Sequence, residues 1–124
     1  MAEPTTLYTR LGGYDSIAAV ADNLLPRLMA DPELGRFWQH RSKDSLRREK
    51  QLLIDFICSC AGGPLLYVGR DMKISHAGMQ ISEKDWSAFM GHLNKTLGAL
   101  EVPQQERDDV VAFIDSTRND IVEC

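Results

Sequence analysis

Three histidines and three cysteines are the side chains of this 124-residue chain best suited to ligate a metal or to act as nucleophiles. Zinc takes three or four His, Cys or carboxylate ligands at close spacing, and His40, His76 and His92 have no cysteine pair at a usable spacing. Cys58 and Cys60 lie two residues apart in an apolar segment, so in a helix their side chains point in different directions. No serine or cysteine accompanies a histidine in a known catalytic motif. The spacing therefore disfavours a zinc site and nucleophilic catalysis, and we expect both cysteines to behave as small hydrophobic residues.

The stretch from Gly62 to His76 is the most specific part of the sequence. Its double glycine and proline stop a helix, and an aromatic residue, a third glycine and a short basic segment then lead to the histidine. Met72, His76 and Gln80 recur at a spacing of four, which predicts that they share one face of a helix. A lone histidine of this kind is more often a packed structural residue than a ligand. The alternative is a bound haem, because haem iron needs one axial protein ligand and a large apolar slot.

Helical periodicity dominates the chain before this stretch. We expect a short helix over residues 6–11, ended by a double glycine, and then a long helix that Asp15 caps and that runs to Ala30. The apolar positions of the long helix share one face: Ile17, Val20, Ala21, Leu24 and Leu28. A brief helical turn over residues 33–38 brings two aromatic residues together.

Further helices are expected on both sides of the histidine. One begins at Asp44 or Ser45 and carries a single apolar stripe: Leu46, Leu53, Phe56, Ile57 and Cys60. Residues 64–71 have no helical period. Leu65 to Val68 could form a short strand, but we expect a loop because the sequence offers no partner strand. Ser82 opens a capping box with Asp85 in place of the usual Glu or Gln, and the last helix begins near Gln104. The pattern predicts an all-α fold in a single domain of residues 1–124, with residues 1–5 and 123–124 as flexible tails.

Composition and charge narrow the classes of function. The chain is 44% hydrophobic and 26% charged, which is typical of a soluble globular protein. Its net charge of −4 and pI of about 5.3 argue against nucleic acid, which requires a concentrated basic surface. The N-terminus has no signal-peptide pattern, and no apolar run approaches the roughly 18 residues of a membrane span. We therefore expect a cytoplasmic protein without a nucleic-acid or membrane partner.

An ordered set of motifs resembles the truncated haemoglobins, group I above all. The motifs are Leu11-Gly12-Gly13, Ala30-Asp31-Pro32-Glu33-Leu34, Phe37-Trp38, Gly62-Gly63-Pro64, Tyr67-x-Gly69, Met72-Lys73, His76 and Gly91-His92-Leu93. The resemblance covers nearly the whole chain. It implies a globin-like fold, a truncated two-over-two helical sandwich around haem b. The helices at about 15–30 and 44–61 would form one pair, and those at about 83–100 and 104–122 the other.

The resemblance also implies roles for individual residues. His76 takes the place of the proximal iron ligand, with its second ring nitrogen held by a nearby carbonyl, for which Met72 lies at helical distance. Tyr67, Arg70 and Lys73 are placed as partners of the haem propionates. The remaining predicted haem contacts form the apolar walls of the slot: Phe37, Trp38, Leu53, Phe56, Ile57, Met72, Ile81, Trp86 and Met90.

The distal side departs from the family pattern. A tyrosine of the second helix commonly donates a hydrogen bond to bound oxygen in this family, and Leu25 is the aligned residue here. Bound oxygen carries negative charge and is stabilised by hydrogen-bond donors. Oxygen binding is therefore expected to be weaker unless another group replaces the tyrosine. The candidate donors are His40, Arg47, Lys50 and Gln51. His40 or Lys50 could also occupy the sixth coordination position of the iron.

Three functional hypotheses follow from the resemblance. The first is reversible binding and transport of a diatomic gas, oxygen above all, with carbon monoxide and nitric oxide as further ligands. The second is a nitric oxide dioxygenase or peroxidase-like activity that involves His40 and Arg41 and, because the chain has no flavin or nicotinamide motif, needs an external reductase. The third is a haem-based sensor, or a helical interaction protein that has lost haem and kept the fold.

Overall fold

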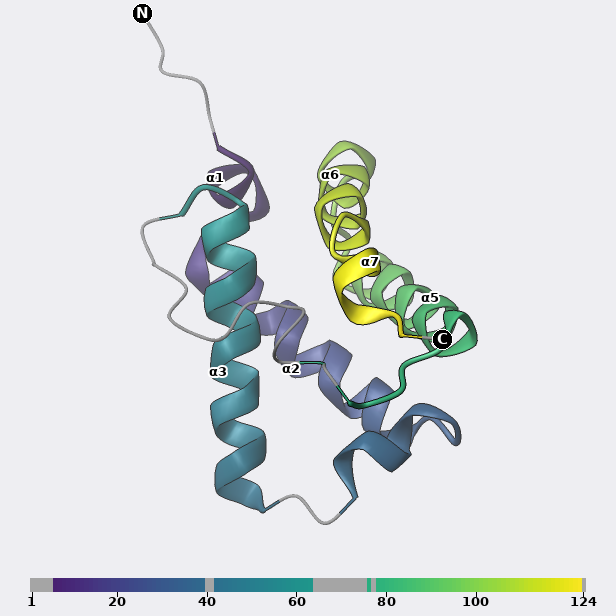
Figure 1. Ribbon diagram of the computed structural model, residues 1–124. Coiled ribbons are helices and arrows are strands. Elements are labelled where there is room, and N and C mark those ends of the chain that lie inside the picture. Colours follow the sequence, from purple (N-terminus) through teal and green to yellow (C-terminus); the bar gives the residue numbers. More distant parts are fainter. Residues whose placement is uncertain (1–5, 40–41, 64–75, 77, 124) are drawn as a thin grey trace, which may run out of the picture.

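The computed structural model describes residues 6–39, 42–63, 76 and 78–123. All elements in these residues are helical, which confirms the all-α prediction (Figure 1). In chain order they are α1 (Leu7–Leu11), α2 (Tyr14–Ala30), the 3₁₀ helix η1 (Leu34–Trp38), α3 (Lys43–Cys60), α5 (Glu83–Ala99), α6 (Gln104–Asp115) and α7 (Arg118–Ile121). None of the described helices is long and apolar enough to cross a membrane.

The helices pack as two pairs. α2 lies against α3 in one half of the molecule, and α5 lies against α6 in the other half (Figure 1). α2 also contacts α5 and η1, and η1 contacts α5, so the two pairs share one main core. This arrangement confirms the predicted two-over-two sandwich.

Side-chain caps define where α3 and α5 begin. The Ser82 hydroxyl accepts a hydrogen bond from Asp85 N, and the Asp85 carboxylate accepts one from Ser82 N, so the predicted capping box is present. α3 starts slightly earlier than the predicted Asp44 or Ser45, because the Ser42 hydroxyl accepts a bond from Ser45 N at 3.0 Å. In each helix, the serine hydroxyl accepts a hydrogen bond from a first-turn backbone N–H that has no partner within the helix.

The predicted cap of α2 by Asp15 is wrong. Gly13 is the N-cap residue, with φ of 84°, and Asp15 lies inside the first turn of the helix. A carboxylate at that position still interacts favourably with the positive end of the helix dipole. Gly12 ends α1 in the left-handed conformation, with φ of 107°, so the two glycines turn the chain within two residues.

The double glycine after α3 fits α1 against the end of that helix. A Cβ atom at Gly63 would lie 2.5 Å from Cδ2 of Tyr8, so a side chain there would displace the tyrosine ring. Tyr8 N also donates to Ala61 O at 2.9 Å. Gly63 therefore allows close approach between two segments far apart in the sequence.

The predicted apolar face of α2 is correct, whereas the stripe predicted for α3 is only partly correct. All five predicted positions of α2 are buried. In α3 the buried residues are Ile54, Ile57 and Cys58, while Cys60 is exposed. Ile54, Ile57 and Cys58 form a smaller cluster with Ile17 and Ala21 of α2. α3 therefore presents one apolar face to α2 and carries a second apolar face next to the first.

The last predicted helix is divided in two. α6 ends at Asp115, and α7 begins at Arg118. The hydroxyls of Ser116 and Thr117 donate to the carbonyls of Phe113 and Ile114, at 2.5 and 2.6 Å. Such local bonds compete with the helical ladder and account for the break.

Candidate functional site

An apolar cavity of about 270 Å³ lies among the helices. Side chains from α2, η1, α3, α5, α6 and α7 contribute to its walls. The apolar lining residues are Leu25, Leu28, Leu34, Phe37, Trp38, Leu52, Leu53, Phe56, Met79, Ile81, Trp86, Phe89, Ile114 and Ile121. The polar ones are Glu49, His76, Asp85 and Thr117. His76 is the imidazole among them.

A sharp backbone turn follows His76. Met79 N donates to His76 O at 3.2 Å, and Gly78 and Gln80 have φ of 83° and 55°. The left-handed conformation at Gln80 places it outside a helix, so the prediction that His76 and Gln80 share one helical face is wrong. Met72, the third member of that pattern, lies outside the described residues.

Aromatic rings form much of the cavity wall. Phe37 and Trp38 meet edge to face, with ring centroids 6.3 Å apart, and Trp86 and Phe89 stack at 5.6 Å. Six of the predicted slot residues line the cavity, namely Phe37, Trp38, Leu53, Phe56, Ile81 and Trp86. Ile57 and Met90 do not. Phe89 follows Trp86 by three residues in α5, so helical spacing could have predicted it as a wall residue.

An ion pair between a half-exposed arginine and a buried aspartate connects η1 to α5 at the edge of this cavity. Arg36 Nη2 lies 2.6 Å from Oδ2 of Asp85, whose side chain is only 4% exposed, and the guanidinium also lies 4.2 Å from the centre of the Phe37 ring. The Arg36 hydrogen bond holds the pKa of Asp85 below its usual range. This ion pair therefore connects the start of α5 to η1, which carries the two aromatic residues.

A second contact ties the same region to α5. His92 Nε2 lies 2.7 Å from Oδ2 of Asp31, and Asp31 Oδ1 accepts hydrogen bonds from the backbone N–H groups of Glu33 and Leu34. The bond with His92 and these N–H groups lower the pKa of Asp31 to about 2. His92 therefore supports the chain before η1 and does not line the cavity.

Three of the proposed distal donors lie away from the cavity. Lys50 pairs with Asp22 at 2.7 Å, and Arg47 lies 3.9 Å from Asp44 on the exposed side of α3. Gln51 is exposed, and its amide donates to Tyr14 Oη and Asp55 Oδ1, at 3.1 and 2.9 Å. These three residues therefore do not line the cavity in this structure, and their replacement of the missing donor stays a prediction.

The helical period explains this result. The residues of α3 that line the cavity are Glu49, Leu52, Leu53 and Phe56, spaced by three or four residues, and positions 47, 50 and 51 fall on other faces. Glu49 was missed by the sequence analysis, although it lies four residues before Leu53. Leu25 does line the cavity. His40, Tyr67, Arg70 and Lys73 lie outside the described residues.

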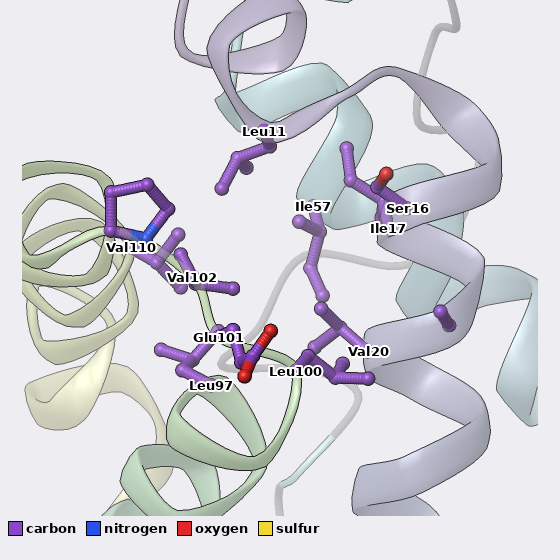
Figure 2. Close-up of a pocket in the computed structure, with 12 residues that line it drawn as sticks. Leu11, Ser16, Ile17, Val20, Ile57, Leu97, Leu100, Glu101, Val102 and Val110 are labelled. Carbon is purple, nitrogen blue, oxygen red and sulfur yellow. The ribbon is translucent and has the colours of Figure 1, made fainter.

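A smaller cavity of about 220 Å³ lies near the ends of α1 and α5. Figure 2 shows its largely aliphatic wall, with Val20, Ile57 and Leu97 around the space and the carboxylate of Glu101 beside it. Among the described residues its lining contains no imidazole and no thiol. It therefore offers no imidazole for haem iron among these residues, whereas the larger cavity offers His76.

The larger cavity fits the requirements of haem. The macrocycle needs an apolar slot with one axial ligand, and His76 supplies an imidazole between mainly aliphatic and aromatic walls. The cavity therefore offers two features that a haem site needs, an apolar slot and an imidazole.

Comparisons with known proteins agree with a haem-binding helical protein. The family model of the bacterial-like globins matches residues 6–123, so the chain belongs to that family. A group 1 truncated haemoglobin of Mycolicibacterium paratuberculosis is 30% identical over 113 residues, which are 91% of this chain and 81% of that protein. Another from Tetrahymena pyriformis is 27% identical over 98% of each chain. Within the family, the chain is a group 1 truncated haemoglobin and hence a haem globin.

Solved structures show the same fold. The Fe(III) form of truncated haemoglobin from Tetrahymena pyriformis has a TM-score of 0.88 and 25% identity, and the match covers 97% of this chain and all of that one. The cyanomet 2/2 haemoglobin of a Synechococcus species, which carries covalently attached haem, has a TM-score of 0.86 and 26% identity over 95% of this chain and 98% of that one.

Proposed function

We propose that this chain binds haem b in the larger cavity, with His76 as the proximal ligand, and that it reversibly binds a diatomic gas, chiefly oxygen. The observation that carries the proposal is that His76 lines an apolar cavity whose wall also contains Phe56 of α3 and the stacked Trp86 and Phe89 of α5. When bound, the haem iron supplies a coordination position for a diatomic gas. The side chains of the cavity wall would determine how a gas reaches that position and how water is kept from it.

The walls of the cavity exclude water and hold a flat apolar group. Leu53, Phe56, Ile81 and Trp86 would contact the macrocycle, and Phe37 and Trp38 would cover its edge. The neutral imidazole of His76 would bind iron through one ring nitrogen. By family resemblance, Tyr67, Arg70 and Lys73 would bind the propionates, and the carbonyl of Met72 would accept the second N–H of His76.

The cavity wall contains Leu25 where the family commonly has a donor tyrosine. Leu25 has no hydrogen-bond donor, and the neighbouring wall of α3 is apolar at Leu52, Leu53 and Phe56. Among the candidates named from the sequence, His40 lies outside the described residues and stays a candidate donor. We therefore expect oxygen to leave quickly unless His40 reaches the pocket, and replacement of His40 by leucine tests this.

The central experiment replaces His76 by glycine. The full-length protein is supplied with haem, and absorption spectra are recorded for the ferric, ferrous and oxygenated forms. His76→Gly should lose the wild-type ferrous spectrum and oxygen binding, and added imidazole should restore the spectrum.

A matched control replaces His92 by glutamine. This histidine lies on α5 outside the cavity, so His92→Gln should keep the wild-type spectrum. A His76→Gly protein with unchanged spectra and oxygen binding would exclude His76 as the ligand. A wild-type protein that takes up no haem would refute the proposed function itself.

A further inference from the structure

The carboxylate of Glu123 binds the turn that directly follows His76. Its Oε2 accepts a hydrogen bond from Gly78 N at 3.0 Å, and its Oε1 accepts one from Gln80 N at 2.7 Å. From the sequence, Glu123 is expected in a flexible tail. The hydrogen bonds connect it instead to a segment more than forty residues earlier in the chain.

The conformation of this turn explains why a carboxylate suits it. Gly78 and Gln80 both have positive φ, which turns nearby backbone N–H groups toward a common point. Such concave arrangements of N–H groups bind anions. The N–H groups of Gly78 and Gln80 lower the pKa of the Glu123 carboxyl, so it is ionised at neutral pH. The positive φ at Gln80 is costly for a residue other than glycine and needs support from its surroundings.

Glu123 is itself held in place at several points. Its own N–H donates to Ile81 O at 2.8 Å, and Ile121 is buried in the cavity wall. In α7, Arg118 Nε donates to Glu83 Oε2 at 3.1 Å at the start of α5. Figure 1 shows the C-terminal end of the chain beside the segment that leads into α5. The turn after His76 is therefore bound to an anchored part of the molecule.

We propose that Glu123 is a positioning residue for His76, and this inference rests on the proposed role of His76 as the haem ligand. The turn is coupled to the histidine through the bond from Met79 N to His76 O. While Glu123 holds Gly78 and Gln80, the backbone that carries His76 keeps one orientation. Without the carboxylate, Gln80 can leave its left-handed conformation, and the imidazole enters the cavity over a wider range of angles.

The test compares Glu123→Ala and Glu123→Gln with Asp120→Asn as the matched control. Asp120 is an exposed carboxylate of α7, and its replacement removes the same charge without touching the turn. Glutamine keeps one acceptor oxygen, so Glu123→Gln should be intermediate if the hydrogen bonds matter. Circular dichroism of each full-length variant establishes that it is folded.

Two measurements on these proteins separate positioning from general stability. Backbone hydrogen exchange at Gly78 and Gln80 should become about tenfold faster in Glu123→Ala and stay unchanged in Asp120→Asn. In the ferrous haem-loaded protein, Glu123→Ala should show a displaced or broadened iron–histidine stretching band. Its haem should also dissociate about tenfold faster than that of the control.

The outcomes distinguish this inference from the proposed function. Unchanged exchange in Glu123→Ala, or faster exchange with an unaltered stretching band, overturns the role of Glu123 while haem binding stands. A wild-type protein that takes up no haem overturns the proposed function and the inference with it. Faster exchange together with an altered band, and a smaller effect in Glu123→Gln, supports the inference.

Discussion

Replacement of Asp85 by alanine should destabilise the protein by about 2 kcal/mol. Asp85 is 4% exposed and accepts hydrogen bonds from Ser82 N at 3.0 Å and from Arg36 at 2.6 Å. Loss of the capping-box carboxylate costs about 1 kcal/mol. A hydrogen bond between charged groups contributes about 1.5–3 kcal/mol when shielded, and we reduce this to about 1 kcal/mol because the Arg36 side chain is 44% exposed.

Urea and thermal unfolding measure this change. All variants must be compared at the same haem saturation, because a ligand that binds the native state adds its own stability. For a chain of this length, Asp85→Ala should lower Tm by roughly 6–10 °C. A double-mutant cycle with Arg36→Ala should give a coupling energy of about 1 kcal/mol between the two side chains.

Lys84→Ala provides the matched control. The pair of Lys84 with Glu33 joins the same two regions at 3.4 Å, but its side chains are 78% and 57% exposed. An exposed pair contributes little, so Lys84→Ala should change stability by less than about 0.5 kcal/mol. If Asp85→Ala matches this small effect, or if the coupling to Arg36 is close to zero, the ion pair does not hold η1 against α5.

Two further results are expected. Leu25→Tyr places a hydroxyl donor at the cavity wall and should slow oxygen release about tenfold in stopped-flow experiments, and equal rates in Leu25→Tyr and Leu25→Phe would contradict this. The folded-state pKa of Asp31 is depressed from 3.8 to about 2, so its contribution to stability is present above pH 3.8 and is lost as the pH falls toward 2. The stability difference between wild type and Asp31→Asn in urea unfolding should therefore shrink over that range, and a constant difference would refute the assignment.

Much of the helical framework could be predicted because its signals are local. The capping box of Ser82 and Asp85, the double glycine after α1 and the apolar period of α2 each act within one or two helical turns. Such signals depend on neighbouring residues, which the sequence lists in order. The break between α6 and α7 was not predicted, although the bonds of Ser116 and Thr117 to carbonyls three residues earlier are also local.

The sequence by itself determined an all-α chain with one distinctive histidine, and its ordered motifs along nearly the whole chain indicated the family. The tertiary structure decided which face of α3 contacts α2 and which lines the cavity. When a helix has two apolar faces, the apolar period alone does not assign a partner to each face. It therefore placed Glu49 in the cavity wall and turned Gln51 away. It also brought together Arg36 with Asp85 and Glu123 with the turn after His76, since pairs so distant in the chain meet only when the helices pack.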